Sequence, residues 1–132
     1  MKGISSKVTG GVSIGSIITC DDNSGAKVLK VIGKEGYRGR KNRRATIGVG
    51  DILIASVIKG NVRMRKKKVR CLLIRQRKEY RRANGMRVKF EDNAAIVVTD
   101  KNEPQSSEIK GVIAKEVAER FPKVATIAKN VM

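Results

Sequence analysis

The apolar residues of this chain fall into short runs that are separated by turn-forming or charged segments. Five of these runs have the length of a strand and are rich in Val, Ile, Leu and Ala: residues 16–20, 27–32, 51–58, 69–74 and 93–99. β-Branched residues in runs of this length, bounded by turn formers, are typical of strands. The pattern therefore predicts a mainly β fold, and a small five-stranded β-barrel is the most economical arrangement.

Two of these runs carry more information than their length. Residues 51–58 (DILIASVI) are apolar at both alternating sets of positions. A strand of this kind is covered on both sides, so we expect the outer surface of the barrel to be overlaid here. Residues 69–74 are apolar but flanked by basic residues at both ends. This arrangement predicts a core strand whose two ends extend toward a polyanion.

Helical spacing is confined to the C-terminal part of the chain. Two apolar sets recur at positions i, i+3, i+4 and i+7, namely Ala114, Val117, Ala118 and Phe121, then Val124, Ile127, Ala128 and Val131. With Pro122 between them, they predict two short helices over about 114–131. Each helix is too short to be stable alone in water, so its apolar stripe covers the barrel or binds a partner. Core packing is the interpretation we favour.

The segments between the runs predict turns, loops and a ribbon. Asn84-Gly85 is a strong hairpin signal and predicts a basic two-stranded ribbon over about 75–90. Asp21 to Gly25 contains only turn formers, which favours a turn over a cation site formed by its two adjacent carboxylates. Residues 1–15 predict an irregular arm or a weak edge strand, and residues 100–107 a polar loop.

Charge adds a function class to this fold. The chain has 132 residues, which suggests a single domain over 1–132, and a net charge of +18. Residues 1–90 hold 24 basic and 5 acidic side chains, whereas residues 91–132 hold 6 and 7. Such an excess indicates nucleic acid as the partner. The first part of the chain is thus expected to contact a polyanion, and the near-neutral tail to pack on protein.

The basic residues gather in two stretches. Lys59 to Arg82 contains twelve Lys or Arg and only one acidic residue, and residues 33–50 form a long basic loop. A dense cationic cluster repels itself until phosphates replace its neighbours and counterions are released. For the 33–50 loop, a merely solvated flexible loop is the alternative. The candidate RNA-binding residues are Lys34, Arg38, Arg40, Lys41, Arg43, Arg44, Arg63, Arg65, Lys66, Lys67, Lys68, Arg75, Arg77, Lys78, Arg81 and Arg82.

The aromatic residues give little support for base stacking. There are four, and they are dispersed in the sequence. Phe90 and Phe121 are expected in the core, whereas Tyr37 and Tyr80 lie among arginines and are candidates for stacking on bases. Recognition is therefore expected to depend on phosphate, sugar and shape, which suits structured RNA.

Catalytic and metal chemistry are disfavoured. The chain has no histidine and two cysteines, which we expect to be buried free thiols, so a zinc site and the commonest general base are missing. No cofactor or metal is expected. The alternative is a metal-dependent nuclease that uses Asp21, Asp22 and Asp51.

The apolar runs also bear on the membrane. None approaches the roughly 20 residues of a spanning helix, and the N-terminal segment is too interrupted by Gly, Ser and Thr for a signal peptide. We therefore expect a cytoplasmic protein without a membrane partner.

Several short motifs together point to a family. They are Cys20-Asp21-Asp22-Asn23-Ser24-Gly25-Ala26-Lys27, Gly48-Val49-Gly50-Asp51, Arg75-Gln76-Arg77-Lys78, Asn84-Gly85, Phe90-Glu91-Asp92-Asn93-Ala94 and Gly111-Val112-Ile113-Ala114-Lys115-Glu116. In this order, over essentially the whole chain, they resemble the family of large-subunit ribosomal protein number fourteen (uL-fourteen), in its archaeal and eukaryotic branch. The motifs are specific in combination, although none is so alone.

The resemblance implies a fold, a function and partners. The family has a five-stranded β-barrel with a protruding ribbon and C-terminal helical turns. It binds large-subunit rRNA and contributes to an intersubunit bridge with small-subunit rRNA. Implied partners are ribosomal protein number three, the twenty-four-e protein and, at the C-terminal region, an anti-association factor. Candidate protein contacts there are Glu116, Glu119 and Arg120. A free RNA-binding or chaperone module outside the ribosome is the alternative.

Overall fold

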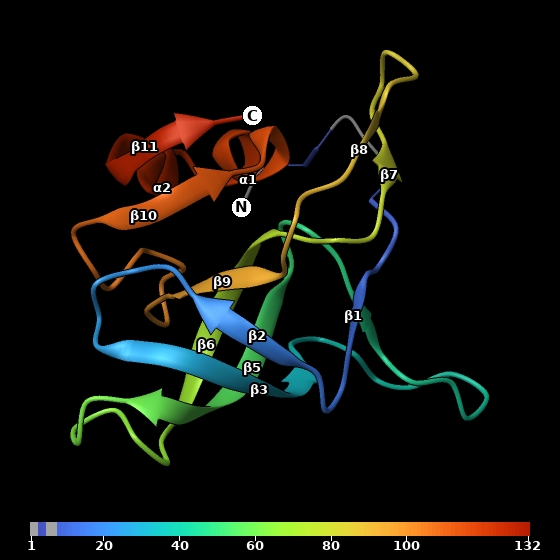
Figure 1. Ribbon diagram of the computed structural model, residues 1–132. Coiled ribbons are helices and arrows are strands. Elements are labelled where there is room, and N and C mark those ends of the chain that lie inside the picture. The colour runs from blue at the N-terminus through green and yellow to red at the C-terminus, as the bar shows by residue number, and fades with distance from the viewer. Residues whose placement is uncertain (1–2, 5–7) are drawn as a thin grey trace.

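The computed structural model describes residues 3–4 and 8–132, and its centre is a closed five-stranded barrel (Figure 1). The barrel strands are β2 (Ile17–Cys20), β3 (Ala26–Lys34), β5 (Ile52–Gly60), β6 (Lys68–Arg75) and β9 (Ala94–Val97). Neighbours in the order β2-β3-β5-β6-β9 are antiparallel, and a parallel pairing of β9 with β2 closes the barrel. The predicted mainly β fold and five-stranded barrel are confirmed.

Alternation along the strands fills the barrel with aliphatic side chains. Ile18, Leu29 and Val57 are in register on three neighbouring strands, and all three are buried. They belong to one apolar cluster with inward residues of β6 and β9, among them Leu73 and Ala95. Inward positions of a small barrel are filled by side chains in this way, so the interior is a packed core.

A second apolar cluster lies between the barrel and a C-terminal layer, which Figure 1 shows above the barrel. Leu72 and Ile96 point outward from β6 and β9 and belong to this cluster together with Val117, Phe121 and Val124. β6 is therefore buried on both faces, and the helical stripes pack on the barrel as favoured above. Both predicted core phenylalanines pack in this cluster, Phe121 buried and Phe90 partly so.

The C-terminal layer differs in detail from the helical prediction. It consists of β10 (Ile109–Ile113), α1 (Lys115–Arg120), α2 (Pro122–Ile127) and β11 (Ala128–Val131). The two short helices are confirmed, but the expectation of helix to residue 131 is wrong, because the chain becomes extended at Ala128 and pairs in parallel with β10. Pro122 is the first residue of α2, where its missing N–H costs nothing.

Two small strand pairs stand beside the barrel. β1 (Val12–Ser13) pairs with β4 (Thr46–Ile47), which places a short strand within the predicted basic loop. β7 (Tyr80–Arg81) pairs with β8 (Arg87–Val88) as the predicted ribbon, which is shorter than 75–90. Gly85 has a φ of 86° in the turn, a conformation that glycine adopts without strain. The parts of the predicted N-terminal arm at 1–2 and 5–7 lie outside the described residues.

In the described part of the chain, the expected cover reaches only the first residue of β5, Ile52, which is buried in the second apolar cluster. Ile54 and Ile58 point outward and are 37% and 41% exposed. The apolar cover of the barrel lies over β6 and β9, so only one side of the barrel is overlaid.

Candidate nucleic-acid interface

Three basic segments extend from the barrel at separate points (Figure 1). The loop 35–44 follows β3 and lies beside the start of β5, because Lys34 pairs with Leu53. The loop 61–67 joins β5 to β6 at the opposite end. The ribbon formed by β7 and β8 follows the C-terminal end of β6, and Figure 1 shows it projecting past the C-terminal layer. The rigid barrel thus spaces the three segments.

Most of the predicted RNA-binding side chains are exposed on these segments. The exposed ones are Arg38, Arg40, Lys41, Arg43, Arg44, Arg63, Arg65, Lys66, Lys67, Lys68, Arg77, Lys78 and Arg81. Among the described residues, none of these side chains forms an ion pair. Lys89, next to β8, is exposed in the same way, whereas the exposed Arg87 pairs with Glu79 at 3.3 Å. Apart from Arg87, these cations therefore face water with their charge uncompensated by the described part of the protein.

The other three predicted residues are only partly exposed and serve the fold. Lys34 forms an ion pair with Asp51 at 3.0 Å. Arg82 pairs with Glu116, and Arg75 with two carboxylates. The side chain of Arg75 is only 12% exposed, and Arg75 is the last residue of β6, so it is not part of the ribbon that was predicted over about 75–90. Basic residues that are close in sequence therefore differ in role, because some form ion pairs within the described part of the protein and others do not.

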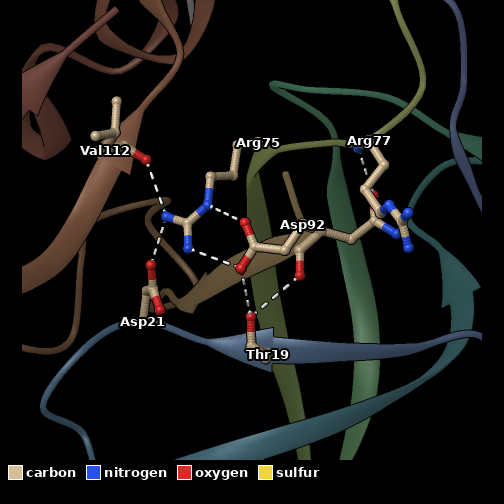
Figure 2. A network of polar contacts seen from close by, with 7 residues as sticks. Thr19, Asp21, Arg75, Arg77, Asp92 and Val112 are labelled. Carbon is tan, nitrogen blue, oxygen red and sulfur yellow. Dashed lines mark hydrogen bonds and ion pairs between the residues drawn. The ribbon is translucent and has the colours of Figure 1, made fainter. Parts of the chain in front are cut away.

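Figure 2 shows how Arg75 ties the barrel to the C-terminal layer. Its guanidinium donates to Asp92 through Nε at 2.6 Å and Nη2 at 3.0 Å, and through Nη1 to the backbone oxygen of Val112 at 3.0 Å. It also forms an ion pair with Asp21 at the end of β2. These hydrogen bonds lower the pKa of Asp92 and raise that of Arg75, since each partner stabilises the other's charge.

A second buried network fixes the base of the ribbon to α1. The hydroxyl of Tyr80 donates to Glu116 at 2.7 Å, and Arg82 Nε donates to the same carboxylate at 2.9 Å. Arg82 Nη2 also donates to the backbone oxygen of Met132 at 2.5 Å. Burial raises the pKa of Glu116, but the hydrogen bonds from Tyr80, the backbone and Arg82 outweigh it and leave the pKa below its ordinary value.

This network overturns two sequence-based expectations. Tyr80 is fully buried with its pKa raised by burial and by Glu116, so its ring is not available for stacking on bases. Glu116 is buried as well, so it is not a surface contact for a protein partner. Tyr37 stays on the surface, where its hydroxyl donates to the backbone oxygen of Arg43 at 2.8 Å. The helical spacing gave no signal for the burial of Glu116, because position 116 is not one of the four apolar stripe positions 114, 117, 118 and 121.

The other two candidate protein contacts lie at the surface of α1. Glu119 is exposed and lies 4.0 Å from Lys115, the distance of a weak surface pair. Arg120 is partly exposed and reaches back to the barrel, where its Nη1 lies 3.4 Å from the backbone oxygen of Gly50 and 3.9 Å from Asp51.

The carboxylates of the nuclease alternative are engaged elsewhere. Asp21 pairs with Arg75, and Asp51 with Lys34. Asp22 is buried and accepts hydrogen bonds from the backbone N–H groups of Ser24 and Val97, so the predicted turn is confirmed. Within the described residues, no group of three or more His, Cys, Asp or Glu is arranged to hold a metal ion.

The thiols and one amide complete the polar interior. Both cysteines are free as expected; Cys71 is buried, whereas Cys20 is only partly so, and burial raises the pKa of Cys20 to about 12. Sequence analysis did not identify Gln76, whose buried amide accepts from Val49 N–H and donates to the backbone oxygen of Thr9. A glutamine within a basic run gives no signal of burial. No helix in the described part of the chain is long and apolar enough to cross a membrane.

Comparison with known proteins gives a consistent result. The family model described as "Ribosomal protein L14p/L23e" matches residues 11–132. The protein named "Large ribosomal subunit protein uL14" from Halorubrum lacusprofundi is 50% identical over 132 residues, which is 100% of both chains. Those of the same name from Methanospirillum hungatei and Halobacterium salinarum are 50% identical over 97% of both chains and 47% identical over 100% of both chains.

Proposed function

Because this chain belongs to the ribosomal protein L14p/L23e family, we propose that it is a structural constituent of the large ribosomal subunit and binds large-subunit rRNA through its basic loops and ribbon. The family resemblance inferred from short motifs is confirmed, and so is its branch, since the relatives are mostly archaeal. Members of this family are structural components, which agrees with a role other than catalysis.

One observation supports the RNA-binding part of the proposal: the basic residues of the loops form no ion pairs with any described residue, whereas several at the barrel and the C-terminal layer do. Carboxylates such as Asp21, Asp51 and Asp92 are held by basic residues of the barrel and the C-terminal layer. The exposed cations of the two loops are left without a counter-charge among the described residues. A polyanion that supplies phosphates at three spaced points satisfies this arrangement, because each contact releases counterions.

The geometry favours recognition of RNA shape over base sequence. The loops lie at opposite ends of β5, and Arg and Lys contact phosphate regardless of the base. The described surface holds one exposed aromatic ring, that of Tyr37, which is too few for a stacking platform. A folded rRNA junction whose phosphates match the spacing of the three segments is the ligand we propose.

We extend the proposal to the bridge and to protein neighbours. The ribbon and the two loops face different directions, which allows one of them to reach small-subunit rRNA while the others hold the large subunit. On the tail, Glu119 and Arg120 remain at the surface as candidate contacts for ribosomal protein number three, the twenty-four-e protein or an anti-association factor.

The test has a cellular arm and a binding arm. Sedimentation of cell extract is expected to place the protein with large subunits, and a high-salt wash is expected to leave it there. Recovery at the top of the gradient would instead favour the free RNA-binding module.

In the binding arm, changing Arg63, Arg65, Lys66, Lys67 and Lys68 to Gln is expected to weaken binding to a large-subunit rRNA fragment. Each phosphate that the variant no longer neutralises reduces the log–log salt slope by roughly 0.7–0.9. The control changes Lys115 and Lys129, which are exposed but paired with Glu119 and Glu108, and is expected to leave the slope unchanged. An unaltered slope in the five-residue variant would mean that this loop is only solvated.

A further inference from the structure

We propose that the outer surface of β2, β3 and β5 binds a protein that presents an apolar stripe flanked by acidic side chains. We call this surface the isoleucine face, after Ile17, Ile32, Ile54 and Ile58. It lies on the side of the barrel away from the C-terminal layer (Figure 1). It is therefore distinct from the basic loops proposed to contact RNA and from the tail residues proposed to contact protein.

Strand register places these side chains on one surface. Ile17 pairs directly with Lys30, and Lys30 with Ser56, so these three side chains point to the same side. The pairing of β3 with β5 is irregular near Ile32 and Ile58, and there the alternation of burial shows the side. Ile32, Ile54 and Ile58 are exposed, whereas the residues beside them in sequence, Val31, Ala55 and Val57, are buried inside the barrel. The four isoleucines are 65%, 41%, 37% and 41% exposed in the order of their numbers.

A gathering of exposed isoleucines on one sheet face indicates an interface. Single exposed apolar residues are ordinary, whereas contiguous apolar patches mark binding surfaces. The opposite side of the barrel shows what such a face requires, since Leu72 and Ile96 are fully buried beneath the C-terminal layer. Among the described residues, no corresponding layer covers the isoleucine face. We therefore expect another molecule to bind there.

The charges around the isoleucine face select the partner. Lys30 is exposed within the face, between Ile17 and Ser56, and Lys68, which is also a candidate RNA contact, is exposed at its edge on β6. Neither lysine has an ion pair in the described chain. The carboxylate of Glu35 is bound to Arg70, which lies opposite Ile54. A face on which exposed isoleucines alternate with unpaired lysines is complemented by an apolar stripe with acidic side chains beside it.

Two other occupants fit less well. RNA would supply phosphates to the lysines, but it offers little apolar surface to bury four isoleucines. A second copy of the chain would bring together two molecules of net charge +18. A protein segment with Asp or Glu beside its apolar residues satisfies both the isoleucines and the lysines.

The experiment is photo-crosslinking in living cells. p-Benzoylphenylalanine replaces Ile54 or Ile58 in the full chain, and as a control Val62, which is 89% exposed in the loop 61–67. After irradiation, adducts are sorted by nuclease and protease treatment, and the joined peptides are sequenced. We expect positions 54 and 58 to capture the same protein segment, apolar and flanked by Asp or Glu, and position 62 not to capture it.

A charge exchange completes the test. Changing Lys30, which is not among the candidate RNA contacts, to Glu is expected to lower the adduct yield about twofold, the effect of one surface ion pair. Changing the partner's acidic residues to Lys is expected to restore it. Nuclease-sensitive adducts at 54 and 58, adducts with a second copy, or no adduct would each overturn the proposal. Sedimentation of the same cells reports separately on membership of the large subunit, so the two proposals can fail independently.

Discussion

At the scale of the residue, Arg75 and Arg77 show how position decides the role of a charge. They are two residues apart in one basic run, yet Arg75 is held by Asp21 and Asp92, whereas Arg77 is exposed. The acidic partners come from segments far away in sequence. A paired arginine stabilises the fold, and an unpaired one is available to phosphate. Only tertiary structure separates the two, which is why the sequence indicated both as RNA contacts.

Gly111 offers a test of the Arg75 network. A Cβ at this position would collide with the carboxylate of Asp21 and the guanidinium of Arg75. Gly111→Ala is therefore expected to lower the free energy of unfolding by about 1–3 kcal/mol through overpacking. Gly33→Ala is the control, because nothing lies within 4 Å of a Cβ there, and its effect is expected to stay within about 0.5 kcal/mol. Chemical denaturation measures both; equal effects would show that the network adapts freely.

At the scale of the element, the ribbon depends on α1. Tyr80 and Arg82, at the base of the ribbon, donate hydrogen bonds to Glu116, the second residue of α1. The sequence predicted the ribbon and both helices from turn residues and periodicity. It did not predict β10 or β11, because their few apolar residues fit helix and strand patterns equally well. Their parallel pairing joins segments that are separated by both helices.

Glu116→Gln is expected to loosen the ribbon and to destabilise the protein by about 1–3 kcal/mol, since it removes the charge that strengthens the hydrogen bonds from Tyr80 and Arg82. Amide hydrogen exchange in residues 80–88 should rise. The control, Glu119→Gln, changes an exposed carboxylate of the same helix. Unchanged exchange in the ribbon would show that its own turn suffices to hold it.

The same carboxylate predicts a pH dependence. The pKa of Glu116 is lower in the folded than in the unfolded chain. Its contribution is therefore complete above the unfolded pKa of about 4.3 and disappears as the pH falls through the folded value. The difference in stability between wild type and Glu116→Gln should be constant near neutral pH and shrink in acid. A difference that grew in acid would contradict the assignment.

At the scale of the whole molecule, unpaired cations extend from a barrel whose neighbouring carboxylates, Asp21, Asp51 and Asp92, are held in ion pairs. Composition alone predicted that the molecule carries a large positive charge, and the pattern of apolar runs predicted the barrel. The one-sided cover was not predicted, because an apolar strand does not reveal whether its own chain or another covers its outer face. The exposed Ile54 and Ile58 illustrate this limit.

This distribution of charge predicts opposite responses to salt. Raising the ionic strength from about 0.05 M to about 0.5 M screens the repulsion between the loops, so the melting temperature of the free protein should rise. The complex with an rRNA fragment should weaken over the same range. Thermal scans and binding titrations in the same buffers measure the two effects. A free protein that melts lower in high salt would mean that its internal ion pairs outweigh loop repulsion.

The parallel pairing that closes the barrel also sets a timescale. Thr19 lies opposite Ala94, far along the chain, so β2 cannot find its second neighbour until most of the chain is available. Contacts between such distant segments slow folding, and domains dominated by them fold in milliseconds to seconds. Until β2 pairs with β9, one edge of each of these two strands and the side chain of Ile18 are exposed to solvent. The cationic loops have already been synthesised by then. Newly made chains are therefore most prone to premature association with RNA during this interval, before the barrel has closed.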